Sequence, residues 1–188
     1  MKNIFILALC FSFFLSSCDL VKVANVKKNS HVRDENYERI ADGITAGVAL
    51  KVKKEKRLQC IGTGGGMMSN IQMMATSFQF FHEVNLDEAR ELVVTATSEY
   101  LTAINGSKEL RPYLEIYPFG PKNVEVMIWI KEPNGNNVPF DKIDFVSAVN
   151  GVLKYDLPDD PQTHADRELH RETYEEALKI VNERAKAS

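Results

Sequence analysis

The sequence has no excess of basic charge and no apolar run long enough to cross a membrane as a permanent helix. Its 23 Lys and Arg residues stand against 26 Asp and Glu residues, a formal net charge of −3 at pH 7. This balance does not indicate the basic patch of a nucleic-acid-binding domain. The longest apolar stretch, residues 4–15, is shorter than the about 20 residues that a spanning helix needs. We therefore expect no nucleic-acid partner and no transmembrane helix.

The first 18 residues have the order of a signal peptide. Lys2 supplies a short positive region, residues 4–15 are apolar apart from Ser12, and Leu15-Ser16-Ser17-Cys18 closes the segment. Such a segment fits the apolar region of a secretory signal, which is removed. Its last four residues resemble the lipobox of bacterial membrane lipoproteins: an aliphatic residue, two small residues and the cysteine that receives the lipid. The alternative is an ordinary secreted protein that is cut at a nearby small residue.

The resemblance implies cleavage before Cys18, a diacylglycerol thioether on Cys18 and often a further acyl chain on the new amino group. Two or three acyl chains give stable anchoring to a bilayer. We therefore expect residues 1–17 to be a lipoprotein signal peptide and the rest to be extracytoplasmic on a bacterial cell membrane, on the periplasmic side in a Gram-negative cell. Asp19 resembles the inner-membrane retention signal of enteric bacteria, and the choice between inner and outer membrane stays open.

Cysteine is scarce, and this scarcity excludes an internal disulfide. Of the three cysteines, Cys10 leaves with the signal and Cys18 carries the lipid, so only Cys60 remains. One thiol cannot form an intramolecular bridge. The stability of the domain must therefore come from its core. We expect Cys60 to be buried and inert, because it lies in an apolar segment.

Periodicity predicts one tether and one domain. Residues 18–36 contain the lipidated Cys18 and a flexible polar tether, and residues 37–188 form a single α+β domain. A mainly antiparallel sheet of about five strands, with two or three helices packed on it, is expected. The predicted elements, in chain order, are a helix over 37–48, strands over 58–63 and 71–81, a helix over 85–106, strands over 124–131, 143–149 and 152–157, and a final helix from 160.

Two segments hold the sharpest local signals. Asn85 and Glu88 have the spacing of a capping box at a helix start, although Ser or Thr is the usual first residue. Asn150-Gly151 is typical of a two-residue hairpin, because a type I′ turn needs positive φ at both positions.

Several motifs resemble binding or catalytic sequences without completing them. Residues 62–66, Gly-Thr-Gly-Gly-Gly, resemble a phosphate-binding loop, but Met67 stands where a dinucleotide fingerprint needs glycine and no Gly-Lys-Ser or Gly-Lys-Thr follows. We expect a turn or bulge between two strands there. Four further groups of side chains have the residue types of a metal or catalytic site, and we assign them to packing, ion pairs or turns instead. The two candidate metal sites with a named ion are Met67, Met68, Met73 and Met74 for copper and Asp156, Asp159 and Asp160 for calcium. The other two groups are His164, Asp166, Glu168 and His170 on the final helix, and Cys60 with His82. The sequence therefore predicts no catalytic residue, no metal site and no cofactor.

Aromatic residues are the best candidates for recognition. Tyr113, Tyr117 and Phe119 lie on a loop stiffened by three prolines, and Trp129 lies on a strand whose core-facing residues alternate with it. Aromatic side chains on a stiff loop offer contact area with little entropy to lose. We expect these four residues to contribute to a surface that binds a protein partner, with Trp129 on the uncovered face of the sheet beside the loop. The alternative is that they cap the core.

The sequence favours a membrane-anchored, non-catalytic module that binds partners or assists envelope assembly. Two alternatives stay open: an immunity-type or inhibitor lipoprotein with one tight partner, and an extracytoplasmic hydrolase whose residues are not identifiable from the sequence.

Overall fold

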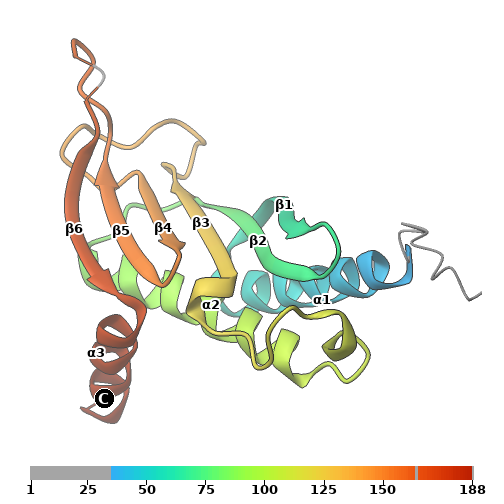
Figure 1. Cartoon of the computed structure of the whole chain (residues 1–188). Coiled ribbons are helices and arrows are strands. Elements are labelled where there is room, and N and C mark those ends of the chain that lie inside the picture. The colour runs from blue at the N-terminus through green and yellow to red at the C-terminus, as the bar shows by residue number, and fades with distance from the viewer. Residues whose placement is uncertain (1–34, 164, 188) are drawn as a thin grey trace, which may run out of the picture. The chain divides into compact units, whose positions relative to one another are not determined.

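Residues 35–163 and 165–187 are the part of the chain that the computed structural model describes, and they belong to one compact unit (Figure 1). The predicted signal peptide, Cys18, most of the predicted tether and His164 lie outside the described residues. None of the helices in the described ranges has the length and apolar content needed to cross a bilayer.

The described residues form one mixed sheet in which the strands lie in chain order. All neighbouring pairs are antiparallel except β2 and β3, which are parallel. The six strands are β1 (Gln59–Met67), β2 (Ile71–Phe80), β3 (Val124–Ile130), β4 (Phe145–Val149), β5 (Val152–Leu157) and β6 (Arg167–Thr173). The three α-helices are α1 (Glu35–Lys56), α2 (Leu86–Gly106) and α3 (Tyr174–Ala187). The expected α+β fold is confirmed, and β6 is one strand more than the expected five.

Helix α2 provides the crossover that lets β3 run parallel to β2. The Asn85 side chain accepts hydrogen bonds from the backbone N–H groups of Asp87 and Glu88, and the Glu88 carboxylate accepts one from the Asn85 N–H. This capping box satisfies donors that a helix start otherwise leaves unpaired. The predicted helix start is therefore confirmed.

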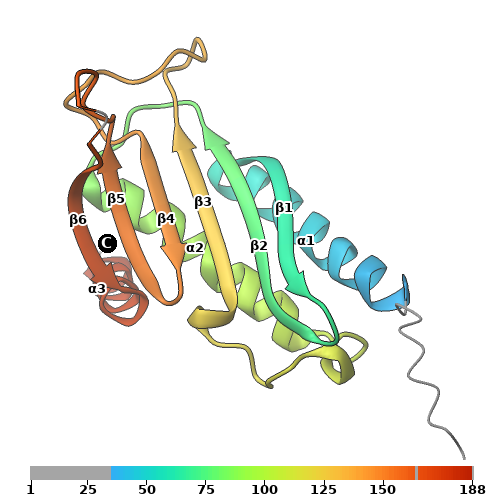
Figure 2. The same ribbon diagram turned by 45° about the horizontal axis from the view of Figure 1, so that its top comes forward.

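The helices α1 and α2 pack on one face of the sheet, as Figure 2 shows with the sheet in front of them. The core lies between these two layers. Along β3 the side chains of Val124, Val126, Ile128 and Ile130 are fully buried, while the residues between them are partly exposed. This alternation confirms the predicted period of two.

The turn between β4 and β5 is built as predicted. Asn150 and Gly151 have φ values of 51° and 76°. Positive φ at both central residues is the requirement of the type I′ turn, whose twist matches that of the flanking strands.

The glycine-rich segment is not the turn between two strands. Gly62, Gly64, Gly65 and Gly66 all lie within β1, and the chain turns at residues 68–70. Register shifts stand at either end of the run, between Cys60 and Gly62 and between Gly66 and Met67. The prediction that this strand ends at Thr63 is therefore wrong, because pairing with β2 holds the glycines extended.

The final helix begins 14 residues later than predicted. Asp160 accepts hydrogen bonds from the backbone N–H groups of Gln162 and Thr163 and so stabilises a turn. Residues 167–173 then form β6 at the sheet edge beside β5, and α3 begins at Tyr174. The helical spacing of Leu169 and Thr173 with later apolar residues is overridden by pairing with β5, which tertiary contacts can impose against local preference.

Candidate functional site

The sheet has one face that α1 and α2 do not cover (Figure 2). We call it the open face. Strand β3 contributes Glu125, Met127 and Trp129 to it, and the register of the neighbouring strands adds Ala75, Ser77 and Gln79 from β2, Phe145 and Ser147 from β4, Lys154 and Asp156 from β5 and Glu168 and Arg171 from β6.

Trp129 and Phe145 form the aromatic centre of the open face. They are register partners on β3 and β4, and their ring centroids lie 4.9 Å apart at an interplanar angle of 54°. Both side chains are partly exposed. No hydrogen bond to another described residue engages the indole N–H of Trp129. The pair therefore offers apolar area together with one hydrogen-bond donor, a combination that is enriched at interfaces.

The other end of the same face is charged. Lys154 Nζ lies 3.8 Å from Asp156 Oδ1, 3.3 Å from Asp166 Oδ2 and 3.4 Å from Glu168 Oε2. Arg171 adds a two-pronged contact to the Glu168 carboxylate. Asp156 is only 8% exposed, and its Oδ1 atom accepts no hydrogen bond from the described residues. Burial raises the pKa of Asp156, while Lys154 opposes that shift.

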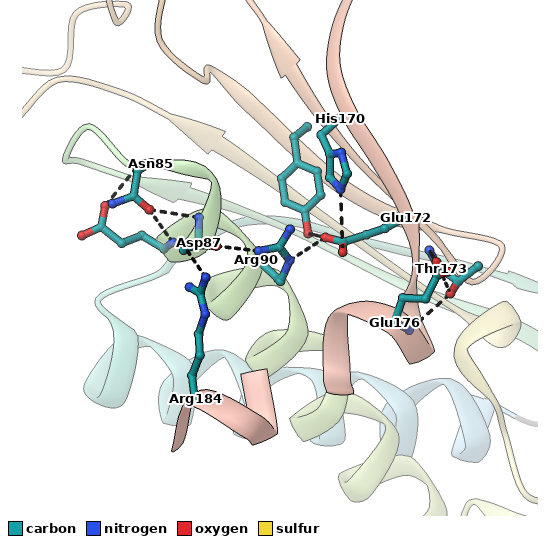
Figure 3. A network of polar contacts seen from close by, with 10 residues as sticks. Asn85, Asp87, Arg90, His170, Glu172, Thr173, Glu176 and Arg184 are labelled. Carbon is teal, nitrogen blue, oxygen red and sulfur yellow. Dashed lines mark hydrogen bonds and ion pairs between the residues drawn. The ribbon is translucent and has the colours of Figure 1, made fainter. Parts of the chain in front are cut away.

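A second polar cluster lies on the helix side of the sheet (Figure 3). Arg90 on α2 donates from Nε to Glu172 Oε1 at 2.7 Å and from a terminal nitrogen to Asp87 at 2.6 Å. The Tyr155 hydroxyl donates to the same Glu172 oxygen at 2.7 Å. His170 Nε2 lies 3.8 Å from the other Glu172 oxygen. The carboxylate of Glu172 thus joins α2, β5 and β6.

The outer end of this cluster joins α2 to α3. Arg184 reaches Asp87 at 2.6 Å, and this hydrogen bond lowers the pKa of the Asp87 carboxyl. Burial and the neighbouring Glu172 carboxylate raise the pKa of Tyr155. A cavity of about 230 Å³ between α2 and α3 is lined by Asp87, Arg90 and Arg184, among others. Ion-pair networks of structural origin perturb pKa values in this way, so we interpret the cluster as a joint that holds the C-terminal strand and helix.

The aromatic loop divides between core and surface. Phe119 is 3% exposed, and the Asn105 side chain holds its backbone through N–H and C=O at 2.8 and 2.9 Å. Tyr113 packs its ring on Tyr37 with centroids 5.4 Å apart. Tyr117 is 45% exposed. Phe119 therefore belongs to the core and not to the surface where the sequence placed it.

Trp129 does not lie beside this loop. In the sheet register Trp129 is the partner of Gln79, whereas Leu114 of the loop forms a bridge with Ile71 at the opposite end of β2. Eight residues of extended strand separate Gln79 from Ile71, roughly 26 Å at about 3.3 Å per residue. The expectation of one surface shared by Trp129 and the loop is wrong, because the register places them at opposite ends of the sheet.

The methionines considered for copper do not converge. Met74 is buried in the core, its neighbour Met73 points to the open face, and Met68 is 84% exposed at the turn. Across residues 35–163 and 165–187 no group of three or more His, Cys, Asp or Glu residues is arranged to hold a metal ion.

Cys60 and His82, considered as a catalytic pair and set aside, contact different residues, and the helix predicted over residues 166–170 does not form. Cys60 Sγ contacts Gly62 O and Thr76 Oγ1, while His82 Nε2 lies 3.5 Å from Arg57. Cys60 is exposed, contrary to the expected burial, because β1 is an edge strand. Residues 167–170 lie on a strand, so Glu168 faces Lys154 and His170 faces Tyr155 on opposite sides of the sheet.

The joint around Glu172 is not among the predicted sites. One local signal was present: Thr173 and Glu176 have capping-box spacing, which marks Thr173 as a helix start and Glu172 as a residue outside the helix. Nothing local indicates that Arg90 would meet Glu172.

No protein-family model matches the chain, and neither a curated protein nor a solved structure is found to be similar to it.

Proposed function

We propose that the protein is a lipid-anchored, non-catalytic binding module of the bacterial cell envelope, held to the membrane through Cys18. Its protein partner would bind the open face of the sheet, with Trp129 and Phe145 at the centre of the contact. The lipobox-like residues 15–18 support the anchoring, and the uncovered aromatic pair supports the binding.

The observation that carries the binding role is the placement of Trp129. Trp129 is partly exposed on a sheet face that α1 and α2 do not cover, its ring is tilted against that of Phe145, and its indole N–H forms no hydrogen bond with a described residue. Tryptophan is among the residues that most often dominate binding energy when a partner covers them. The mixed charges of Lys154, Glu168 and Arg171, at the β5 and β6 end of the open face, would form a polar rim on that side.

Site-specific photo-crosslinking in cells tests the binding role. A photoreactive amino acid replaces Trp129 in the full chain, and the control replaces Lys179 on α3, whose side chain is 76% exposed. We expect discrete adducts from position 129 and none of the same size from position 179. Several adducts would indicate a module that assembles with several partners. One dominant adduct would indicate an inhibitor of a single partner. Identical adduct patterns at both positions, or none at 129, would contradict the proposal.

The anchoring role is tested separately. Cys18→Ala should abolish labelling by a fatty-acid analogue and release the protein from the membrane fraction. Labelling of the variant at the level of the unchanged chain would refute the lipid anchor and leave the crosslinking result to stand by itself.

A further inference from the structure

The edge strand β1 lacks the usual protection against pairing with another strand. Only β2 pairs with it among the described strands, so the other side of its backbone is unpaired. Its nine residues include no charged residue and no proline. The opposite edge, β6, carries Arg167, Glu168, Arg171 and Glu172. Natural edge strands are commonly protected by charged residues or proline, which β6 illustrates and β1 does not.

The glycines of β1 are not required by packing within the chain, with one exception. A Cβ on Gly62, Gly64 or Gly66 would meet its nearest neighbours at 3.8–3.9 Å, an ordinary contact distance. Only at Gly65 would a Cβ come within 2.8 Å of the Met73 carbonyl oxygen. Glycine weakens a strand and often marks a place where another backbone approaches closely. The run thus suits pairing by a second strand.

An apolar groove runs beside this edge, between α1 and β1. It has a volume of about 580 Å³ and is lined by Asp42, Thr45, Ala46, Ala49, Leu50 and Lys53 from α1 and by Gln59, Cys60 and Thr63 from β1. Leu50 is 71% exposed, and Ile61 on the adjoining strand is 51% exposed. Exposed apolar area on a groove typically marks an interaction site.

The charged residues along the groove are complementary to those of a second copy of α1. Asp42 stands near one end and Lys53 near the other, 11 residues or roughly 16 Å apart at about 1.5 Å per residue. Both are exposed, and neither forms an ion pair with another described residue. An antiparallel second copy of α1 would set Asp42 of each copy against Lys53 of the other. The neutral β1 strands would meet without like charges, so the edge is complementary to itself.

We propose that two copies of this chain associate about a twofold axis, with β1 pairing antiparallel to β1 and α1 packing beside α1. Such an interface is isologous, because each copy presents the same patch. The two sheets would become one continuous sheet, and the two open faces would lie on the same side of it. The dimer does not depend on the proposed partner binding, which uses a different surface.

Charge reversal tests the antiparallel arrangement in the full chain, purified in detergent and studied by sedimentation equilibrium. Asp42→Lys and Lys53→Asp should each weaken dimerisation by about tenfold or more, because each creates two like-charge contacts across the axis. The double variant Asp42→Lys/Lys53→Asp should restore the affinity of the unchanged chain. Lys179→Asp on α3 is the matched control and should leave the affinity unchanged.

A second measurement reports on β1 directly. In a Cys60→Ser background, single cysteines are placed at positions 62, 63 and 64, and at Arg171 on β6 as the control. Mild oxidation in membranes should give a covalent dimer for at least one β1 position and none for position 171 or for Cys60→Ser alone.

A monomeric chain at all concentrations, failure of the double variant to restore affinity, or equal trapping at β1 and β6 would overturn the proposal. A monomer that still crosslinks a partner through position 129 would leave the binding role standing.

Discussion

Arg90 and Glu172 lie 82 positions apart in the chain and form an ion pair in which Arg90 Nε donates to Glu172 Oε1 at 2.7 Å. The two side chains are only 7% and 6% exposed. The pair connects α2 with the end of β6, one residue before α3 is capped. It therefore holds the C-terminal segment to the rest of the domain (Figure 3).

Glu172→Ala should destabilise the domain strongly, because it leaves a buried guanidinium and the Tyr155 hydroxyl without their acceptor. Breaking one partner of a buried pair costs about 3–5 kcal/mol. Urea denaturation measures the free energy of unfolding. The exposed pair of Lys142 and Glu83, 3.5 Å apart, is the control, and Glu83→Ala should cost at most about 1 kcal/mol. The double variant Arg90→Met/Glu172→Met should lose less than Glu172→Ala, and an equal or larger loss would contradict the argument.

Helix α3 should depend on a capping box at its start. The Thr173 backbone N–H donates to Glu176 Oε2 at 2.8 Å, and the Glu176 N–H donates to Thr173 Oγ1 at 3.3 Å. Thr173→Ala should cost about 1 kcal/mol, the typical value for an N-cap. Thermal or urea unfolding of the two chains gives this difference, and an unchanged stability would show that the cap is unimportant.

The same capping contact predicts that the free energy of unfolding falls at acid pH. The hydrogen bond from the Thr173 backbone lowers the pKa of Glu176 below its usual value near 4.5. Its contribution to stability is therefore present above the unfolded pKa and is lost as the pH falls through the lower folded pKa. Glu176→Gln should flatten that part of the pH–stability curve. A curve with the same acid limb as that of the unchanged chain would contradict the assignment.

Ionisation of the Asp156 carboxyl should change the free energy of unfolding with pH in the opposite direction. Burial raises its pKa above the usual value of 3.8, so the folded state holds the proton more tightly than the unfolded state. The corresponding stability is present below the unfolded pKa and is lost as the pH rises through the raised folded pKa. Asp156→Asn cannot ionise and should remove this loss. Stability measured across mildly acidic to neutral pH checks the sign, and a variant that loses more stability with rising pH than the unchanged chain would refute it.

Cys60 should contribute little to stability and should not form a disulfide within the domain. It is the free cysteine of the described residues and is exposed on β1. Cys60→Ser should change the free energy of unfolding by less than about 0.5 kcal/mol, the usual range for surface substitutions. Reductant should leave the melting temperature unchanged, whereas a shift of several degrees would indicate an unexpected bridge.

Local chemistry made several elements predictable from sequence. The start of α2 could be predicted because Asn85 and Glu88 satisfy each other's backbone donors within four residues. The β4–β5 turn could be predicted because Asn150 and Gly151 tolerate positive φ. The strand β3 could be predicted because one buried face imposes a period of two. Each of these signals acts between residues that are close in sequence.

The C-terminal region was predicted wrongly where distant residues decide the conformation. Leu169, Thr173 and Ala177 have helical spacing, yet residues 167–173 extend because β5 offers backbone partners along this segment. The glycines of β1 extend for the same reason beside β2. In these two segments, unlike β3, the spacing of the residues themselves gives no sign of the conformation that the neighbouring strand imposes.

The sequence by itself determined the α+β class, the meander from β3 to β5 and the scarcity of cysteine, because these follow from local periodicity, turn chemistry and composition. Only the tertiary structure decided that Phe119 is core, that Trp129 lies far from the aromatic loop, and that Arg90 meets Glu172. The physical reason is that burial and ion pairing depend on which surfaces the sheet register and helix packing bring together, and residues 82 positions apart share no local signal.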